Sequence, residues 1–252
     1  NPLKLINGDK IKNKDLFYGM LVGSVNNVSN IIAQNSGVNE TEFIQNINKR
    51  LEDWGADNTK ISDVSGLSEQ NVSTARDLLK IFVKALDKKE IKEALGLKSY
   101  KITKTSGKKV STQTLNNTNK LLGTTKNYKI LASKTGFTDE ASSTLLMLIE
   151  GKINDPIINL AEKVKFGQTN NQVKQLQALL RKEGFFKHKS NTGYYGTATK
   201  QALDNYSKTR TGKQYIIITL GNKDYKNRFI EPDKIAQWAA LEKYAQIASQ
   251  KP

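Results

Sequence analysis

The sequence predicts an α/β fold that carries a small all-α unit inserted between two of its sheet strands. Three observations lead to this prediction. Apolar residues recur at helical spacing in the N-terminal part of the 252-residue chain. Short runs rich in β-branched and aliphatic residues follow in the middle and near the end. About sixty residues of helical character separate two of these runs, and loop tips tolerate such insertions best.

The N-terminal part is predicted to be helical. Residues 15–34 show a helical pattern that breaks near Ser24. A second helix begins at Asn39, which together with Glu42 resembles a capping box, and it ends at Gly55. The apolar face of this second helix consists of Phe43, Ile44, Ile47, Leu51 and Trp54.

A third helix and a hairpin follow. Thr74 and Asp77 mark the start of the helix, because such residues bind the free N–H groups of a first turn. Side-chain character alternates along residues 100–114 on either side of Ser106 and Gly107, which predicts two strands joined by a turn. The expected inward face of the helix consists of Leu78, Leu79, Phe82 and Leu86.

Three further strands and a last helix are predicted outside the inserted unit. The strands cover residues 130–138, 143–149 and 215–220, and the last of them is expected to be buried. Pro232 begins the helix, because its fixed φ suits a first helical turn. The apolar residues of this helix are Ile235, Trp238, Leu241, Ala245 and Ala248.

The inserted unit contains three predicted helices. The first begins at Asp155 and Pro156, the second covers residues 171–182 before Gly184, and the third covers residues 197–209. Their apolar faces consist of Val173, Leu176, Leu180, Ala202, Leu203 and Tyr206. The expected domains are therefore an outer α/β domain of residues 1–151 and 214–252 and a helical domain of residues 152–213.

Composition narrows the class of protein. An apolar content of 37% favours a globular chain, and no stretch approaches the length of a membrane span. The chain has no cysteine, which excludes disulfides and thiolate chemistry. Its one histidine, His188, stands between Lys187 and Lys189 and is interpreted as a solvated surface residue without a functional role. No metal site and no cofactor are expected.

The net charge of +16 favours anionic partners. Nucleic acid and anionic cell-wall polymers such as teichoic acids are the two candidates. The basic residues are mostly scattered single lysines, without an Arg-rich helix or an aromatic RNA-binding pattern. We therefore expect a solvated lysine-rich surface, with anionic wall polymers as a candidate partner and no nucleic-acid binding.

Two short motifs and six flanking segments carry a family resemblance. The motifs are Ser24-Val25-Asn26 and the run Ser-Lys-Thr-Gly-Phe-Thr over residues 133–138. Together with their flanks they resemble the serine-type D-alanyl-D-alanine carboxypeptidases, which are the low-molecular-mass penicillin-binding proteins. This resemblance implies a β-lactamase/transpeptidase-like α/β fold. The flanking segments are residues 43–48, 54–59, 64–67, 73–78, 117–122 and 215–221.

The inserted unit has a resemblance of its own. The runs 173–177, 184–186 and 192–196 are similar to a small three-helix peptidoglycan-binding domain. The resemblance implies contacts with the cell wall. The residues that it singles out for this module are Gln177, Phe185, Tyr194 and Tyr195.

The resemblance also implies roles for the two motifs. Ser24 would relay a proton toward the leaving group, and Asn26 would orient the general base and hold the substrate backbone. Lys134 would supply positive potential near the substrate carboxylate. These three are the expected catalytic residues.

The substrate-binding residues implied by the resemblance follow Lys134 along the chain. Thr135 would hydrogen-bond the terminal carboxylate, and Arg228 would assist it. Gly136 would let backbone approach backbone, because a Cβ there would block the substrate. The N–H of Phe137 would be one oxyanion donor, and Thr138 completes the substrate-binding set.

The family's Ser-x-x-Lys motif, which supplies the nucleophile and the base, has no match upstream of Ser24. The single match in the chain runs from Ser106 to Lys109, in the wrong order and inside a predicted hairpin, and we interpret it as a chance match. The chain is expected to be N-terminally incomplete, and the alternative is a degenerate relative that only binds cell wall. An incomplete sheet is expected to dimerise or to be completed by the missing segment.

The predicted function is hydrolysis of the terminal D-alanine of peptidoglycan stem peptides through an acyl-enzyme, by an extracytoplasmic, wall-associated protein. This chain by itself is expected to lack the nucleophile. The alternatives are a D,D-endopeptidase and a non-catalytic wall-binding protein. The expected partners are stem peptides and glycan, together with β-lactam inhibitors if the nucleophile is present upstream.

Overall fold

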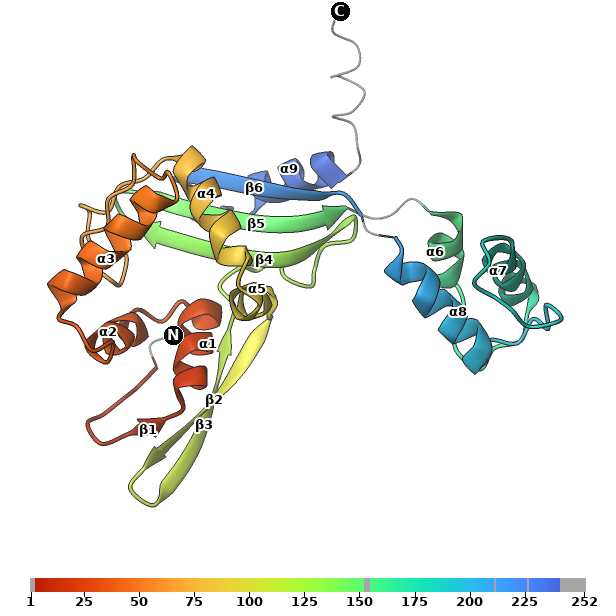
Figure 1. Cartoon of the computed structure of the whole chain (residues 1–252), viewed down its shortest axis with the longest axis horizontal. Helices are drawn as coiled ribbons and strands as arrows, with labels where there is room; N and C mark the ends of the chain where they lie inside the picture. The colour runs from red at the N-terminus through yellow and green to blue at the C-terminus, as the bar shows by residue number, and fades with distance from the viewer. Residues whose placement is uncertain (1–2, 152–154, 211, 226, 241–252) are drawn as a thin grey trace, which may run out of the picture. The chain divides into compact units, whose positions relative to one another are not determined.

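The computed structural model describes residues 3–151, 155–210, 212–225 and 227–240. These residues form two compact units. One contains the residues up to Ile149 and those from Gln214 onward, and the other is Glu150–Lys213. Figure 1 shows the elements of each unit, coloured along the chain.

The outer unit contains a sheet with the strand order β4-β5-β6. Its strands are β4 (Tyr128–Thr138), β5 (Ser142–Gly151) and β6 (Gln214–Asn222). Strands β4 and β5 run in opposite directions (Figure 1). This sheet contains the predicted Lys-Thr-Gly strand, and it is the element on which the candidate site is built.

Helices cover both faces of this sheet. Alternate residues of β5 point to opposite faces, as they must in a strand. Met147 joins a core cluster with Ala236 and Ala239, whereas Leu148 joins a cluster with Phe82 and Leu95. One face is therefore packed by the C-terminal helix and the other by two earlier helices. These are α9 (Ile230–Ala240), α4 (Ala75–Leu86) and α5 (Lys89–Gly96).

A second sheet has the order β1-β2-β3 and supports the N-terminal helix. Its elements are β1 (Lys10–Ile11), β2 (Ser99–Ser106) and β3 (Lys109–Asn116), with helix α1 (Asn13–Gly23) packed on it. A Cβ at Gly19 would lie 2.6 Å from Cδ1 of Ile102, so a glycine is needed where α1 approaches β2. The hydroxyl of Tyr100 donates to the buried Asp15 carboxylate at 2.9 Å, which fixes the same contact.

The predicted starts of two N-terminal helices are confirmed. Helix α3 (Glu40–Asp53) is capped by Asn39, whose side chain accepts from the N–H of Glu42. Helix α4 is capped by Thr74, whose side chain accepts from the N–H of Asp77. The predicted break near Ser24 is also confirmed, because it separates α1 from α2 (Asn26–Gln34).

The inserted unit, Glu150–Lys213, contains α6 (Pro156–Ala161), α7 (Asn171–Lys182) and α8 (Thr197–Lys208). Asp155 caps α6 by accepting from the N–H groups of Ile157 and Ile158. The predicted apolar faces form one core, in which Val173, Leu176 and Leu180 are fully buried. The three predicted helices are therefore confirmed.

Several sequence predictions were wrong in detail. Leu79 was expected to face inward and is 40% exposed, whereas Phe82 of the same predicted face is buried as expected. The strand at 215–220 is confirmed, but only Ile217 of β6 is buried within the described part of the chain. Strand β1 and helix α5 were not predicted, because two residues and eight residues give little periodic signal.

The C-terminal helix begins at Ile230, two residues before the predicted start at Pro232. Its buried side chains are Pro232, Ala236, Ala239 and Ala240, whereas Ile235 and Trp238 are 41% and 37% exposed. Small residues thus face the sheet and larger ones face outward, which the apolar pattern alone did not indicate. The predicted positions Leu241, Ala245 and Ala248 lie outside the described residues.

Candidate active site

Ser24 lies at the corner between α1 and α2 in a left-handed conformation, with φ of 52° and ψ of 49°. A non-glycine residue adopts this region only when its surroundings enforce it. Asn26 is the first residue of α2 and is exposed. The helix break therefore presents the Ser-x-Asn motif on a corner rather than on a helix face.

Lys134 joins this corner to strand β4. Its Nζ donates to the Oγ of Ser24 at 2.6 Å and to the carbonyl oxygen of Thr135 at 2.8 Å. The structure thus brings together two motifs that are far apart in the sequence. Desolvation of the ammonium lowers the pKa of Lys134 to about 8. A lysine of this kind can present either a cation or a neutral amine near neutral pH.

Thr135 points to a different neighbour. Its Oγ1 lies 2.5 Å from the Oγ1 of Thr118. Thr118 is held in place by buried asparagines on either side, since Asn117 donates to the carbonyl oxygen of Leu97 at 3.1 Å and accepts from the N–H of Asn119 at 2.9 Å. Thr118 was not predicted as a site residue, although the Asn-Thr-Asn run that contains it was part of the resemblance.

Gly136 is required by the neighbouring strand. A Cβ at this position would lie 2.5 Å from the Oγ1 of Thr144 on β5, well inside the usual contact distance. The sequence prediction explained this glycine by the approach of substrate. The structure adds a reason within the protein, which is the close packing of Thr144 against β4.

Phe137 and Arg228 come together through a residue that the sequence prediction missed. Phe137 is 46% exposed, and its ring meets that of Tyr225 edge-on with centroids 4.9 Å apart. The guanidinium of Arg228 lies 4.0 Å from the centroid of Tyr225. Arg228 is thus placed near the end of the Lys-Thr-Gly strand by aromatic stacking. Thr138 closes this strand end, because its hydroxyl accepts from the N–H of Ala141 at 3.0 Å.

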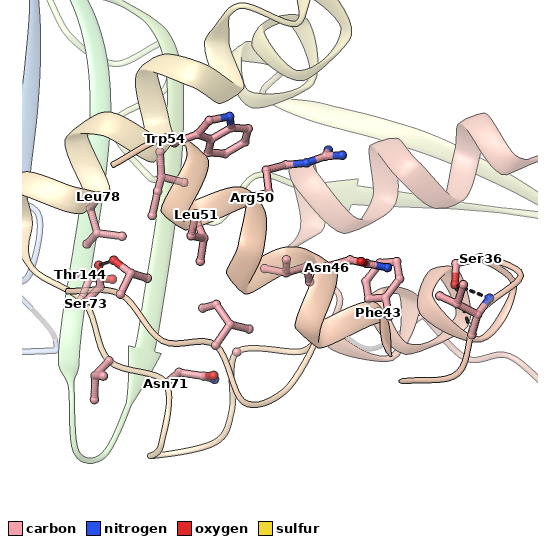
Figure 2. Close-up of a pocket in the computed structure, with 17 residues that line it drawn as sticks. Ser36, Phe43, Asn46, Arg50, Leu51, Trp54, Asn71, Ser73, Leu78 and Thr144 are labelled. Carbon is pink, nitrogen blue, oxygen red and sulfur yellow. Dashed lines mark hydrogen bonds between the residues drawn. The ribbon is translucent and has the colours of Figure 1, made fainter. Parts of the chain in front are cut away.

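A pocket of about 820 Å³ adjoins β5 at Thr144 (Figure 2). Its walls come from α3, α4 and the loop between them, and they are mainly apolar, with Leu51, Trp54 and Leu78 among the lining residues. Thr144 also packs against the position of Gly136, so this residue of β5 links the pocket to the Lys-Thr-Gly strand.

The chance Ser-x-x-Lys match lies in another part of the fold. Ser106 is at the end of β2, opposite Lys109 in the hairpin register, and its hydroxyl donates to the carboxylate of Asp9. Lys104 binds the same carboxylate at 2.8 Å. Two hydrogen bonds lower the pKa of Asp9 to about 2, and the one from Lys104 contributes more than the one from Ser106. This carboxylate is therefore a poor base for activating a serine.

The four residues predicted for the peptidoglycan-binding module differ in how deeply they are buried. Gln177 is buried, and its amide donates to the carbonyl oxygen of Tyr194 at 3.0 Å and to the hydroxyl of Thr199 at 2.9 Å, while its oxygen accepts from Gly193 at 2.8 Å. Tyr195 belongs to the core of the unit. Phe185 packs edge-on against Tyr206. Of the predicted four, only Tyr194 is largely exposed, at 49%.

Two kinds of feature are absent from the residues that the structure describes. No group of three or more metal-binding side chains occurs among them. None of their helices has the length and apolar character needed to cross a bilayer.

The fold and the meeting of the two motifs at Ser24 and Lys134 agree with one known family of α/β proteins. A family described as D-alanyl-D-alanine carboxypeptidase matches residues 3–161, and a putative peptidoglycan binding domain matches residues 169–207. The chain belongs to the D-alanyl-D-alanine carboxypeptidase family, and it carries a peptidoglycan-binding domain. Both predicted resemblances are confirmed.

Curated relatives share a related name. The chain is 32% identical over 165 residues to the D-alanyl-D-alanine endopeptidase of Pseudomonas aeruginosa, with 64% of this chain and 50% of the relative covered. It is 30% identical over 159 residues to the protein of the same name from Escherichia coli, with 63% and 50% covered. The chain therefore spans about half the length of the curated relatives that it matches.

Solved structures confirm the fold class. The chain is similar to the Streptomyces K15 DD-transpeptidase, with a TM-score of 0.54 at 26% identity over 60% of this chain and 59% of that one. A point mutant of the same transpeptidase gives the same TM-score at 28% identity, over the same shares of the two chains. The predicted transpeptidase-like α/β fold is therefore confirmed.

Proposed function

We propose that this chain forms the substrate-binding part of a serine-type D-alanyl-D-alanine carboxypeptidase, which hydrolyses the terminal D-alanine of peptidoglycan stem peptides through an acyl-enzyme. The observation that carries the proposal is the 2.6 Å hydrogen bond from Lys134 to Ser24. It unites the two motifs that the family uses around its nucleophile. The family match and the relatives' names support the same class of substrate.

In this proposal each site residue has a role that its position supports. Lys134 holds the Ser24 hydroxyl and supplies positive potential, and a pKa near 8 lets it exchange a proton at neutral pH. Ser24 relays that proton to the leaving amine, while the exposed amide of Asn26 holds the substrate backbone. The hydroxyl of Thr135, assisted by Arg228, binds the terminal carboxylate.

The nucleophilic serine and its base come, in this proposal, from polypeptide outside these 252 residues. Among the described residues, Ser24 is the only serine that hydrogen-bonds Lys134. Ser106, the only serine in a Ser-x-x-Lys run, is engaged with Asp9. The pocket beside Thr144 is an apolar surface next to the Lys-Thr-Gly strand, which suits a packed segment carrying the missing motif.

The inserted module has a separate part in the proposal. We assign residues 152–213 to wall binding and residues 1–151 and 214–252 to the catalytic domain. A tethered wall-binding module raises the local concentration of stem peptides without any new catalytic contact. Because the family acts on peptidoglycan, the site of action is extracytoplasmic, and association with the cell wall itself is part of this proposal.

Acylation by a penicillin tests the catalytic proposal. The chain is incubated with a labelled penicillin, and its intact mass is recorded beside that of a longer polypeptide that extends upstream. We expect no adduct on the chain alone and one on the longer protein, reduced by Lys134→Ala but not by Lys129→Ala, an exposed lysine on the same strand. An adduct on Ser106, or a longer protein that is never acylated, would contradict the proposal.

A D,D-endopeptidase is the second candidate, and the names of the curated relatives favour it. The two activities differ in which bond is cut. A monomeric pentapeptide muropeptide and a crosslinked dimer would be supplied to the acylation-competent protein, with products identified by mass. Release of free D-alanine from the monomer supports the carboxypeptidase. Cleavage of the dimer alone supports the endopeptidase.

A further inference from the structure

A second groove, of about 1050 Å³, lies on the outer unit and shares no lining residue with the apolar pocket at Thr144. The segment around β1 forms one wall, and helices α1 and α2 form the rest. Asn27, which follows Asn26 of the Ser-x-Asn motif, is one of its lining residues and donates to the carbonyl oxygen of Leu3 at 3.1 Å. This groove and the candidate active site therefore share the N-terminal turn of α2.

The lining of this groove is rich in side-chain amides. Six of its residues are asparagine or glutamine, and two of the six bind the protein itself. Asn27 binds Leu3, and Asn35 donates to the carbonyl oxygen of Ile31 at 2.8 Å. The remaining four are exposed and form no side-chain hydrogen bond with another described residue. They are Asn7, Asn13, Asn30 and Gln34.

Several other asparagines of the outer unit are engaged by the protein backbone. Asn48 spans two backbone segments, because it donates to the carbonyl oxygen of Ile61 and accepts from its N–H. Asn71 accepts from the N–H of Ser62 at 2.7 Å. Asn117 and Asn119 hold the loop that carries Thr118. Those amides bind backbone, whereas the four in the groove keep both donors and acceptors available for a ligand.

Half-buried apolar side chains lie between these amides. Leu5, Ile11 and Leu16 pack on the core cluster beneath the second sheet and also line the groove. The ring of Phe17 adds an aromatic face to the lining. A ligand that fits must therefore offer apolar faces as well as hydrogen-bonding groups.

The charges in the groove are nearly balanced. Asp9 is paired with Lys104 at 2.8 Å, and Lys10 is the other charged residue of the described lining. A free stem peptide carries carboxylates, which would find no cluster of cations here. A glycan strand of N-acetylated aminosugars is uncharged, has apolar ring faces, and displays an acetamido group that can pair with a side-chain amide.

We propose that this groove binds a strand of β-1,4-linked N-acetylated aminosugars, with Asn30 and Gln34 of α2 as hydrogen-bonding partners and Phe17 and Ile31 as apolar contacts. The site belongs to the catalytic unit and is separate from the inserted module. It would hold the glycan backbone beside the turn that presents Ser24 and Asn26. The proposal does not depend on acyl transfer, because glycan binding needs no nucleophile.

Methyl-resolved NMR of the full chain tests this directly. Chitopentaose is the probe, and cellopentaose, which has the same linkage without acetamido groups, is the comparison. We expect chitopentaose to shift the methyl signals of Leu16 and Ile31, and cellopentaose to shift them far less. Titration of these signals gives a dissociation constant for the groove alone, independent of any binding by the inserted module.

Substitution then identifies the amides. Asn30 and Gln34 lie one turn apart on α2, so Asn30→Ala/Gln34→Ala removes both hydrogen bonds while keeping good helix formers. We expect the dissociation constant at Ile31 to rise about tenfold, which is the effect of losing two ordinary hydrogen bonds. Gln45→Ala, at an exposed amide of α3 outside the groove, is the control and should change nothing.

Three results would overturn the proposal. One is the absence of shifts at Leu16 and Ile31 while signals of the inserted module move. Another is equal binding of chitopentaose and cellopentaose, which would remove the acetamido group from recognition. The third is an unchanged dissociation constant in the double variant. None of these results bears on penicillin acylation, so failure here and failure of the proposed catalytic function are distinguishable.

Discussion

The Nζ of Lys134 lies 2.6 Å from the Oγ of Ser24, although 110 positions separate the two residues in the chain. One is on a strand of the central sheet and the other is in the left-handed corner between two helices. This contact connects the sheet to the helical part of the outer unit. It also places a desolvated ammonium group at the point where the proposed chemistry takes place.

The burial of Lys134 should make stability depend on pH. Its pKa is lowered from 10.5 to about 8 in the folded chain, so between these values the unfolded chain binds more protons than the folded one. The free energy of unfolding should therefore rise as the pH increases from about 8 to about 10.5, and the unfavourable contribution is fully present below about pH 8.

Lys134→Met should remove this dependence. The variant should gain stability relative to the wild type near neutral pH and lose that advantage in alkaline solution. Urea denaturation at several pH values measures the difference. Lys129→Met, at an exposed position on the same strand, is the control, and its effect should not change with pH. Parallel pH curves for the wild type and Lys134→Met would contradict the prediction.

Gly136→Ala should destabilise the sheet formed by β4, β5 and β6. The new Cβ would lie 2.5 Å from the Oγ1 of Thr144, and overpacking of this kind costs about 1–3 kcal/mol. Thr144→Ala removes the atom that the Cβ would meet. The double variant Gly136→Ala/Thr144→Ala should therefore be more stable than the sum of the single effects predicts, as measured by a double-mutant cycle from urea unfolding. Strict additivity would show that the contact does not explain the glycine.

Substitutions at Gln177 and Tyr194 should have separate effects on the folding and on the wall binding of the inserted module. Gln177→Leu leaves the N–H of Gly193 and the hydroxyl of Thr199 without their buried partner, so a loss of about 2–4 kcal/mol is expected in the thermal unfolding of this unit. Tyr194→Ala removes a side chain that is 49% exposed and should leave the unfolding temperature nearly unchanged.

The same pair of variants should differ in wall binding. Tyr194→Ala should weaken sedimentation with isolated sacculi although the module remains folded. Lys174→Ala, at an exposed position on α7, serves as the control for nonspecific charge effects. Full binding by Tyr194→Ala would exclude this residue from the wall contact.

Tyr100→Phe should loosen helix α1 from the second sheet. The Tyr100 hydroxyl donates to the buried carboxylate of Asp15 at 2.9 Å. The pKa of Tyr100 is raised to about 12, mainly by desolvation and secondly by this hydrogen bond. Loss of a hydrogen bond to a charged group should cost about 1.5–3 kcal/mol. Amide hydrogen exchange should rise in residues 13–23 more than in α3, which this bond does not hold.

Local patterns in the sequence were sufficient for most elements and for the family. The bounds of α7 agree with the prediction, and the caps Asn39 and Thr74 lie where their side-chain chemistry indicated. These features depend on interactions within one or two helical turns, so the neighbouring residues contain the necessary information. The hairpin turn at Gly107 is local for the same reason.

Contacts between distant segments could be decided only by the tertiary structure. Nothing near Thr135 in the sequence indicates that it meets Thr118, and nothing near Phe137 indicates Tyr225. The apolar residues of α4 and α9 did not reveal that Leu79 and Trp238 face outward. Which side of a helix is buried, and which polar groups meet, depends on how separate elements pack, and packing is a property of the assembled fold rather than of any short stretch of chain.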